Sequence, residues 1–160
     1  MPDRLKPFVL FFAALAALGL ALSIISHVAA LLGRQGPLGE YTFALHVGVF
    51  VVWLPAVLVS RHLAPGLRRK GFWQAALRGC PPWMRFMVYG SFVYGFLNFI
   101  VFLTHVPPNR GPGFLSPSTV RGFSGHWMIF YATAMAILYS AGHVNDRDGR
   151  DAQRNLPPAR

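Results

Sequence analysis

Four long apolar stretches, separated by short polar ones, dominate the pattern of the chain. Each is about 20 residues long or more and almost free of Lys, Arg, Asp and Glu, as suits a helix that crosses roughly 30 Å of hydrocarbon. They run from about Phe8 to Leu32, Tyr41 to Ser60, Trp83 to His105 and Gly122 to His143. The pattern predicts an all-α integral membrane protein with four spanning helices.

Three polar segments accompany these spans within a single membrane domain, residues 1–160. A basic loop covers residues 61–82, a Pro- and Gly-rich loop residues 106–121, and a polar tail residues 144–160. The four prolines in the second loop are expected to prevent regular secondary structure there. With hairpins at both ends, the simplest arrangement is an antiparallel four-helix bundle.

Small residues at four-residue spacing predict where the helices approach closely, because lipid supplies no hydrophobic drive between helices. The candidate seams are Ala13, Ala17 and Ala21 in the first span, Ser91 and Gly95 in the third, and Ala132, Ala136 and Ser140 in the fourth.

The distribution of charge predicts the orientation. The chain has 15 Lys and Arg against five Asp and Glu, a net charge of +10, but 54% of its residues are hydrophobic and only 12% charged. That composition argues against a soluble nucleic-acid-binding domain. Twelve of the 15 cations lie before the first span, between residues 61 and 85, or after His143. The positive-inside rule therefore predicts cytoplasmic termini and a cytoplasmic basic loop, in the inner membrane of a bacterium.

Aromatic residues mark two kinds of membrane surface. Tyr41, Trp83 and Trp127 fall at predicted span edges, where such rings prefer the headgroup layer. The segment Gly71–Arg78 places apolar rings beside the basic run Arg68–Lys70. It is expected either to lie on the anionic inner leaflet as a short helix or to be an ordinary basic loop.

The histidines are the unusual polar feature of the sequence. They form two triples, His27, His46 and His62 in the first hairpin and His105, His126 and His143 in the second. The separations are 19 and 16 residues in the first triple and 21 and 17 in the second. The similar spacing suggests that the second hairpin repeats the first.

Four of these histidines, His27, His46, His105 and His126, fall near the outer ends of the predicted spans. Neutral imidazole is the common ligand of haem iron, copper and zinc, so they are candidate ligands of a metal or of a bis-histidine haem b. The pair His46 and His126 is the first choice and the pair His27 and His105 the second. The outer arginines Arg34, Arg110 and Arg121 are candidates to meet haem propionates.

In helix number and in its intramembrane histidines the chain is similar to four-helix b-type cytochromes, and the resemblance extends no further. Those proteins often place two histidines on one helix about 14 residues apart, so that both share a face. Here the 16- and 17-residue separations rotate the second histidine by about 160° or 260°. A chain of two haems is therefore not expected.

Three functions remain open from the sequence. The first is a small membrane subunit of a larger electron-transfer assembly, with haem b or a metal on the outer histidines. The second is an accessory subunit without a cofactor, whose histidines only join helices. The third is a quinol-binding module in which a histidine accepts a proton. No span carries an acidic residue and no motif predicts catalytic activity of its own.

Overall fold

The computed structural model describes residues 3–63, 69–104 and 116–154, and in these ranges it contains helices and no strand. The helices are α1 (Lys6–Leu31), α2 (Ala44–Leu63), α3 (Arg69–Ala76), α4 (Pro82–Thr104) and α5 (Pro117–Arg154), with the short 3-10 helices η1 (Asp3–Leu5) and η2 (Gly39–Phe43). The segments long and apolar enough to cross a membrane are Lys6–Leu31, Gly39–Arg61, Pro82–Thr104 and Pro117–Val144. The predicted helical class and the four candidate spans are therefore confirmed.

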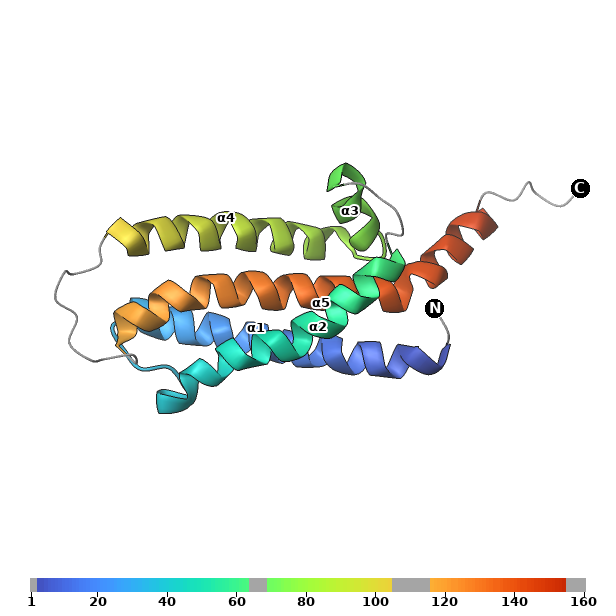
Figure 1. The fold of residues 1–160 in the computed structure, drawn as a ribbon. Helices are drawn as coiled ribbons and strands as arrows, with labels where there is room; N and C mark the ends of the chain where they lie inside the picture. Colours follow the sequence, from blue (N-terminus) through green and yellow to red (C-terminus); the bar gives the residue numbers. More distant parts are fainter. Residues whose placement is uncertain (1–2, 64–68, 105–115, 155–160) are drawn as a thin grey trace, which may run out of the picture.

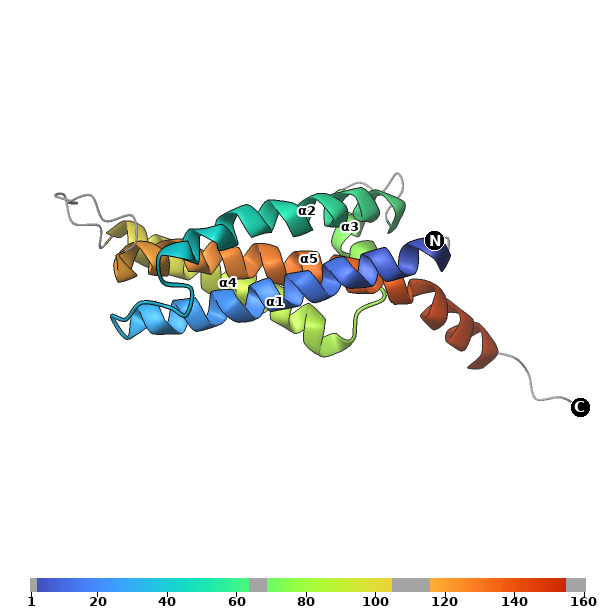
Figure 2. The ribbon, with the colours of Figure 1, turned by 90° about the horizontal axis from the view of Figure 1, so that it is seen from below.

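Helix α5 lies at the centre of the arrangement, with α1, α2 and α4 packed around it (Figures 1 and 2). In its most apolar window 67% of α5 is buried, against 17% for α4. Successive long helices run in opposite directions, so the start of α1 and the end of α5 lie at the same end of the molecule (Figure 1). The core is thus built around the last helix rather than along a central axis shared by four.

The contact between α4 and α5 depends on two glycines that face each other. A Cβ on Gly95 would lie 2.8 Å from the carbonyl oxygen of Gly125, and a Cβ on Gly125 would lie 2.7 Å from Nδ2 of Asn98. The same Asn98 amide donates to the carbonyl of Arg121 at 2.9 Å. The two backbones approach so closely because neither glycine carries a side chain.

The predicted seam on the fourth span is correct, and that on the first is wrong in part. Ala132, Ala136 and Ser140 are fully buried. On α1, however, Ala17 is only half-buried and Ala21 is exposed. A strict four-residue repeat drifts about 40° per step around a helix, whereas α1 is buried along a face that mixes steps of three and four. That face includes Ala13, Ala16, Leu20, Ser23 and His27.

Helix α5 begins earlier than the sequence predicted. It starts at Pro117, inside the segment 106–121 that was expected to be irregular, and it continues beyond the last span to Arg154. Proline suits the first position of a helix, and Oγ of Ser116 accepts a hydrogen bond from the Thr119 amide at 3.3 Å. The expectation is therefore wrong for residues 117–121, while residues 106–115 lie outside the described part of the chain.

Candidate functional site

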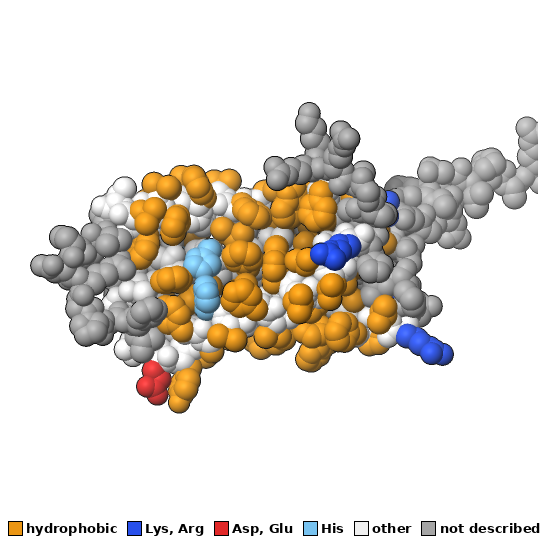
Figure 3. Space-filling model, viewed as in Figure 1, with side chains coloured by type: hydrophobic (Ala, Val, Ile, Leu, Met, Phe, Trp, Pro, Cys, Tyr) orange, Lys and Arg blue, Asp and Glu red, His pale blue; other side chains and the backbone are white. Residues whose placement is uncertain are grey.

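The structure places two of the predicted site residues side by side. His46 lies in the first turn of α2 and His126 in the third turn of α5. Their rings meet edge to face, with centroids 5.6 Å apart and planes at 87°. Both side chains are half-buried. Figure 3 shows histidine side chains forming one patch on this face of the molecule, surrounded by hydrophobic side chains.

Aromatic rings surround the pair. Phe123 lies 5.4 Å from His126 and 6.0 Å from His46, while Phe50 contacts His46 and Phe130 contacts His126. These residues come from α2 and α5 only. The candidate site is thus a surface lined by aromatic rings, with two imidazoles at its centre. It lies in a part of the chain apolar enough to be in the membrane.

A tryptophan fixes the chemical state of one imidazole. Nε1 of Trp127 donates to Nδ1 of His46 at 3.0 Å. Because a neutral imidazole has one N–H and one lone pair, the lone pair of His46 is at Nδ1 and its proton at Nε2. His46 therefore offers an N–H donor to a ligand. No described residue forms a hydrogen bond with the ring of His126, which remains able to accept one.

The position of Trp127 corrects one prediction and adds a residue to the site. The sequence suggested a headgroup-layer ring, but Trp127 is fully buried between Phe43, Phe123 and His46. Tyr41, in contrast, is 71% exposed. A position at the edge of a predicted span could not distinguish the buried ring of Trp127 from the exposed ring of Tyr41. The available signal was His46, which the sequence placed at the same depth, because a buried indole N–H needs an acceptor.

His27 belongs to a different cluster. It is 3% exposed, with Nδ1 2.7 Å from Oγ of Ser124 and Nε2 2.5 Å from the hydroxyl of Tyr94. Ser124 donates its own proton to the carbonyl of Arg121, so its oxygen accepts from Nδ1 of His27, and Tyr94 donates to Nε2. Both ring nitrogens are occupied, and the cluster joins α1, α4 and α5 as a structural brace.

Of the four outer histidines that were expected to meet, the structure brings together His46 and His126 but not His27. Ser124 and His126 are two residues apart, so their side chains leave α5 about 200° apart, and His27 lies on the far side of α5 from the pair. His105 and the side chain of His62 are outside the described residues. His143, near the other end of α5, stacks on Tyr139 with ring centroids 4.1 Å apart.

The pair His46 and His126 does not fit a haem held between its rings. Iron would need the lone pair of each imidazole on opposite faces of a flat macrocycle. The lone pair of His46 is already bonded to Trp127, and the two rings touch each other directly. Nor do the described residues contain three His, Cys, Asp or Glu grouped as metal ligands. Haem or metal ligation stays a prediction that this arrangement does not support.

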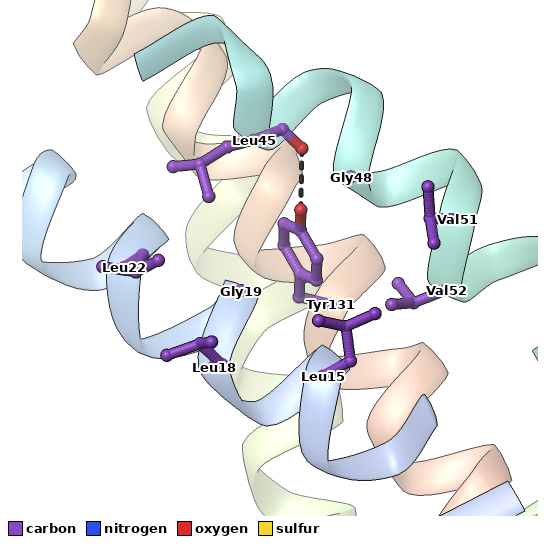
Figure 4. Close-up of a pocket in the computed structure, with 9 residues that line it drawn as sticks. All are labelled: Leu15, Leu18, Gly19, Leu22, Leu45, Gly48, Val51, Val52 and Tyr131. Carbon is purple, nitrogen blue, oxygen red and sulfur yellow. Dashed lines mark hydrogen bonds between the residues drawn. The ribbon is translucent and has the colours of Figure 1, made fainter. Parts of the chain in front are cut away.

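A cavity that was not predicted from the sequence lies between α1 and α2 (Figure 4). It has a volume of about 280 Å³ and its lining is apolar apart from Tyr131. The hydroxyl of Tyr131 donates to the carbonyl of Leu45 at 2.8 Å. A Cβ on Gly19 or Gly48 would overlap Tyr131, so these glycines make room for its side chain. No histidine lines this cavity, and its one polar group is already bonded.

Comparison of the chain with protein-family models, with curated proteins and with solved structures finds no match.

Proposed function

We propose that this protein is a small integral membrane subunit of a larger bacterial inner-membrane assembly, and that the pair His46 and His126 binds the headgroup of a quinone or quinol. The observation that carries the proposal is the pair itself: two touching imidazoles, half-buried among aromatic rings, in an apolar span. Ionisable side chains inside a membrane are costly, and they commonly mark a functional site.

The chemistry of the site matches a quinone better than a metal. Nε2–H of His46 is a donor suited to a quinone carbonyl oxygen, and the ring of His126 can accept the proton of a quinol hydroxyl. Phe123 and its neighbours supply aromatic surface for a flat ring. A site on the outside of α2 and α5 is open to a ligand that arrives through the bilayer.

The proposal concerns binding and positioning. Oxidation of a quinol releases two electrons and two protons, and an electron acceptor would have to come from another integral membrane subunit. The proposed role is therefore to complete a site at a subunit boundary. Cytoplasmic termini, favoured by the cation distribution, place the pair in the outer half of the membrane, since α2 begins two residues before His46.

The second candidate function is an accessory subunit without a cofactor, and the exposed apolar surface of α4 favours it. This helix packs mainly on α5, and it leaves large apolar side chains exposed, including Phe86 at 75%, Phe96 at 64% and Val93 at 62%. Such a face suits lipid or the helices of another subunit. A chain that only braces a larger assembly would bind no quinone.

A titration of the purified protein in detergent with a short-chain alkyl benzoquinone separates these candidates. We expect saturable binding that weakens about tenfold in His46→Phe and in His126→Phe, the loss of one hydrogen bond each. The matched control is His143→Phe, because His143 stacks on Tyr139 away from the pair. If the protein does not bind the quinone, or if binding weakens equally in all three variants, the accessory subunit without a cofactor becomes the better-supported function.

A further inference from the structure

The passage from α3 into α4 forms a second polar feature. It lies at the opposite end of the molecule from the first turn of α2, which carries His46 (Figure 1). Helix α3 is anchored by its last turn and the residue that follows, where Ala76 and Leu77 are buried. The ring of Trp73 packs edge to face on Phe92 of α4, with centroids 5.9 Å apart. The short helix, one of the two alternatives expected for this segment, is therefore present, and Trp73 joins it to α4.

The loop after α3 is held rigidly against α5. The amide of Gly79 donates to Oγ of Ser140 at 2.9 Å, and the thiol of Cys80 donates to the carbonyl of Ala136 at 3.0 Å. A Cβ on Gly79 would overlap the carbonyl oxygen of Ser140, so the approach requires glycine. These contacts fix the backbone of the neighbouring Arg78.

Arg85 reaches back to this loop from the first turn of α4. Its Nη2 donates to the carbonyl of Arg78 at 3.0 Å. Its Nε is buried and has no hydrogen-bond partner among the described residues. The loop thus orients the Arg85 guanidinium, whose Nε–H forms no hydrogen bond with a described residue. Because a buried donor without an acceptor is costly, the Nε–H calls for a ligand that can accept its proton.

No described carboxylate balances this charge. Glu40 is the one acidic residue whose side chain the structure describes, and it lies in η2, between α1 and α2, at the opposite end of the molecule. Trp83, in the same turn of α4 as Arg85, is 60% exposed. A tryptophan at this position suits the headgroup layer.

We infer that Arg85 binds the phosphate of an anionic phospholipid in the leaflet that surrounds the start of α4. Guanidinium groups match the paired oxygens of a phosphate, and the Arg78 carbonyl holds the Arg85 group in place before the lipid arrives. The apolar rings of α3 and α4 are available to the acyl chains. The site is independent of the histidine pair and of its proposed ligand.

Native mass spectrometry of the detergent-purified full chain tests the inference. The probe is phosphatidylglycerol, with phosphatidylcholine as the lipid that carries a phosphate without net negative charge. We expect preferential retention of phosphatidylglycerol, with about fivefold weaker binding in Arg85→Gln, the contribution of one basic residue near an anionic leaflet. Arg85→Lys keeps the charge but loses the planar donor set, and its binding should fall between the two.

Arg34→Gln is the matched control, because Arg34 is an exposed cation in the loop between α1 and α2. It should leave retention unchanged. Equal retention of the two lipids, no loss in Arg85→Gln, or the same loss in Arg34→Gln would overturn the inference. Thermal unfolding of each variant identifies a folding defect, and if Arg85→Gln is unfolded, Arg85→Lys takes its place with a smaller expected loss.

Discussion

At the scale of single residues, the hydrogen bond from Trp127 to His46 decides what the candidate site can bind. An indole N–H is a donor only, so its partner nitrogen must carry a lone pair. The proton of His46 is thereby assigned to Nε2, so this neutral ring has no free lone pair for a metal. Replacing one donor on α5 should therefore change the ligand preference of an imidazole on α2.

Trp127→Phe tests this directly. The substitution removes the donor to Nδ1 of His46, so the ring becomes free to carry its proton on either nitrogen. Nitrogen-15 chemical shifts of labelled histidine should report a single Nε2–H form of His46 in the natural protein and a mixture in the variant. We also expect the variant to lose about 1–3 kcal/mol of folding free energy, since a buried ring shrinks and a hydrogen bond is lost.

The control for this experiment is Trp83→Phe, in which a largely exposed ring changes away from the pair. The His46 signals should then keep their positions. If His46 is an even mixture of both forms in the natural protein, the assignment of its proton fails, and with it the argument that favours a quinone over a metal.

The sequence could identify the histidine pair but not its surroundings. Spacing and span position pointed to His46 and His126 because both are countable from the chain. The same counting grouped His27 with them, because depth along a helix says nothing about the direction in which a side chain leaves it. Only the contacts of His27 with Ser124 and Tyr94 show that it is not part of the histidine pair's site. These contacts depend on how α1 and α4 pack around α5.

At the scale of helices, α4 is attached to the rest of the molecule along one narrow line. Gly95 and Gly125 bring the backbones together, and Asn98 and Tyr94 add hydrogen bonds to α5 and α1. Most of its remaining surface is apolar and exposed. The glycine contact should therefore contribute a large share of the free energy that holds α4 in place.

Gly95→Ala is predicted to weaken this contact. Its new Cβ would lie 2.8 Å from the Gly125 carbonyl oxygen and 2.6 Å from Cδ1 of Ile129, so α4 must move outward. We expect a loss of about 1–3 kcal/mol in the free energy of unfolding, the usual cost of overpacking, measured by denaturant titration in detergent. Gly90→Ala, on the same helix with no atom within 4 Å of the new Cβ, should be neutral or stabilising. Equal losses in the two variants would contradict this role.

Helix existence was predictable from the sequence, whereas helix ends and buried faces were less so. Each span is recognisable as a run of about 20 apolar residues. The start of α5 was missed because four prolines were counted together, although Pro117 follows Ser116 and so occupies a favourable first position. The buried face of α1 was missed because alanines at strict four-residue spacing drift around the helix and leave Ala21 exposed.

At the scale of the whole molecule, both proposed sites depend on which way the chain crosses the membrane. The start of α1, α3 and the end of α5 lie at one end, and the first turns of α2 and α5 at the other (Figure 1). The first end is also the one rich in Lys and Arg. If the positive-inside rule holds, the arginine site faces the inner leaflet and the histidine pair lies in the outer half of the membrane.

Single-cysteine labelling tests this orientation. Cys80→Ser provides the background, because serine retains a donor for the Ala136 carbonyl. Arg34→Cys reports on the loop between α1 and α2, and Gln74→Cys reports on α3, since both positions are exposed. A membrane-impermeant maleimide applied to spheroplasts should label Arg34→Cys alone and should label both variants after permeabilisation. The reverse pattern would invert the molecule, moving the arginine site to the outer leaflet and the quinone site to the cytoplasmic half, while leaving the local chemistry of each site unchanged.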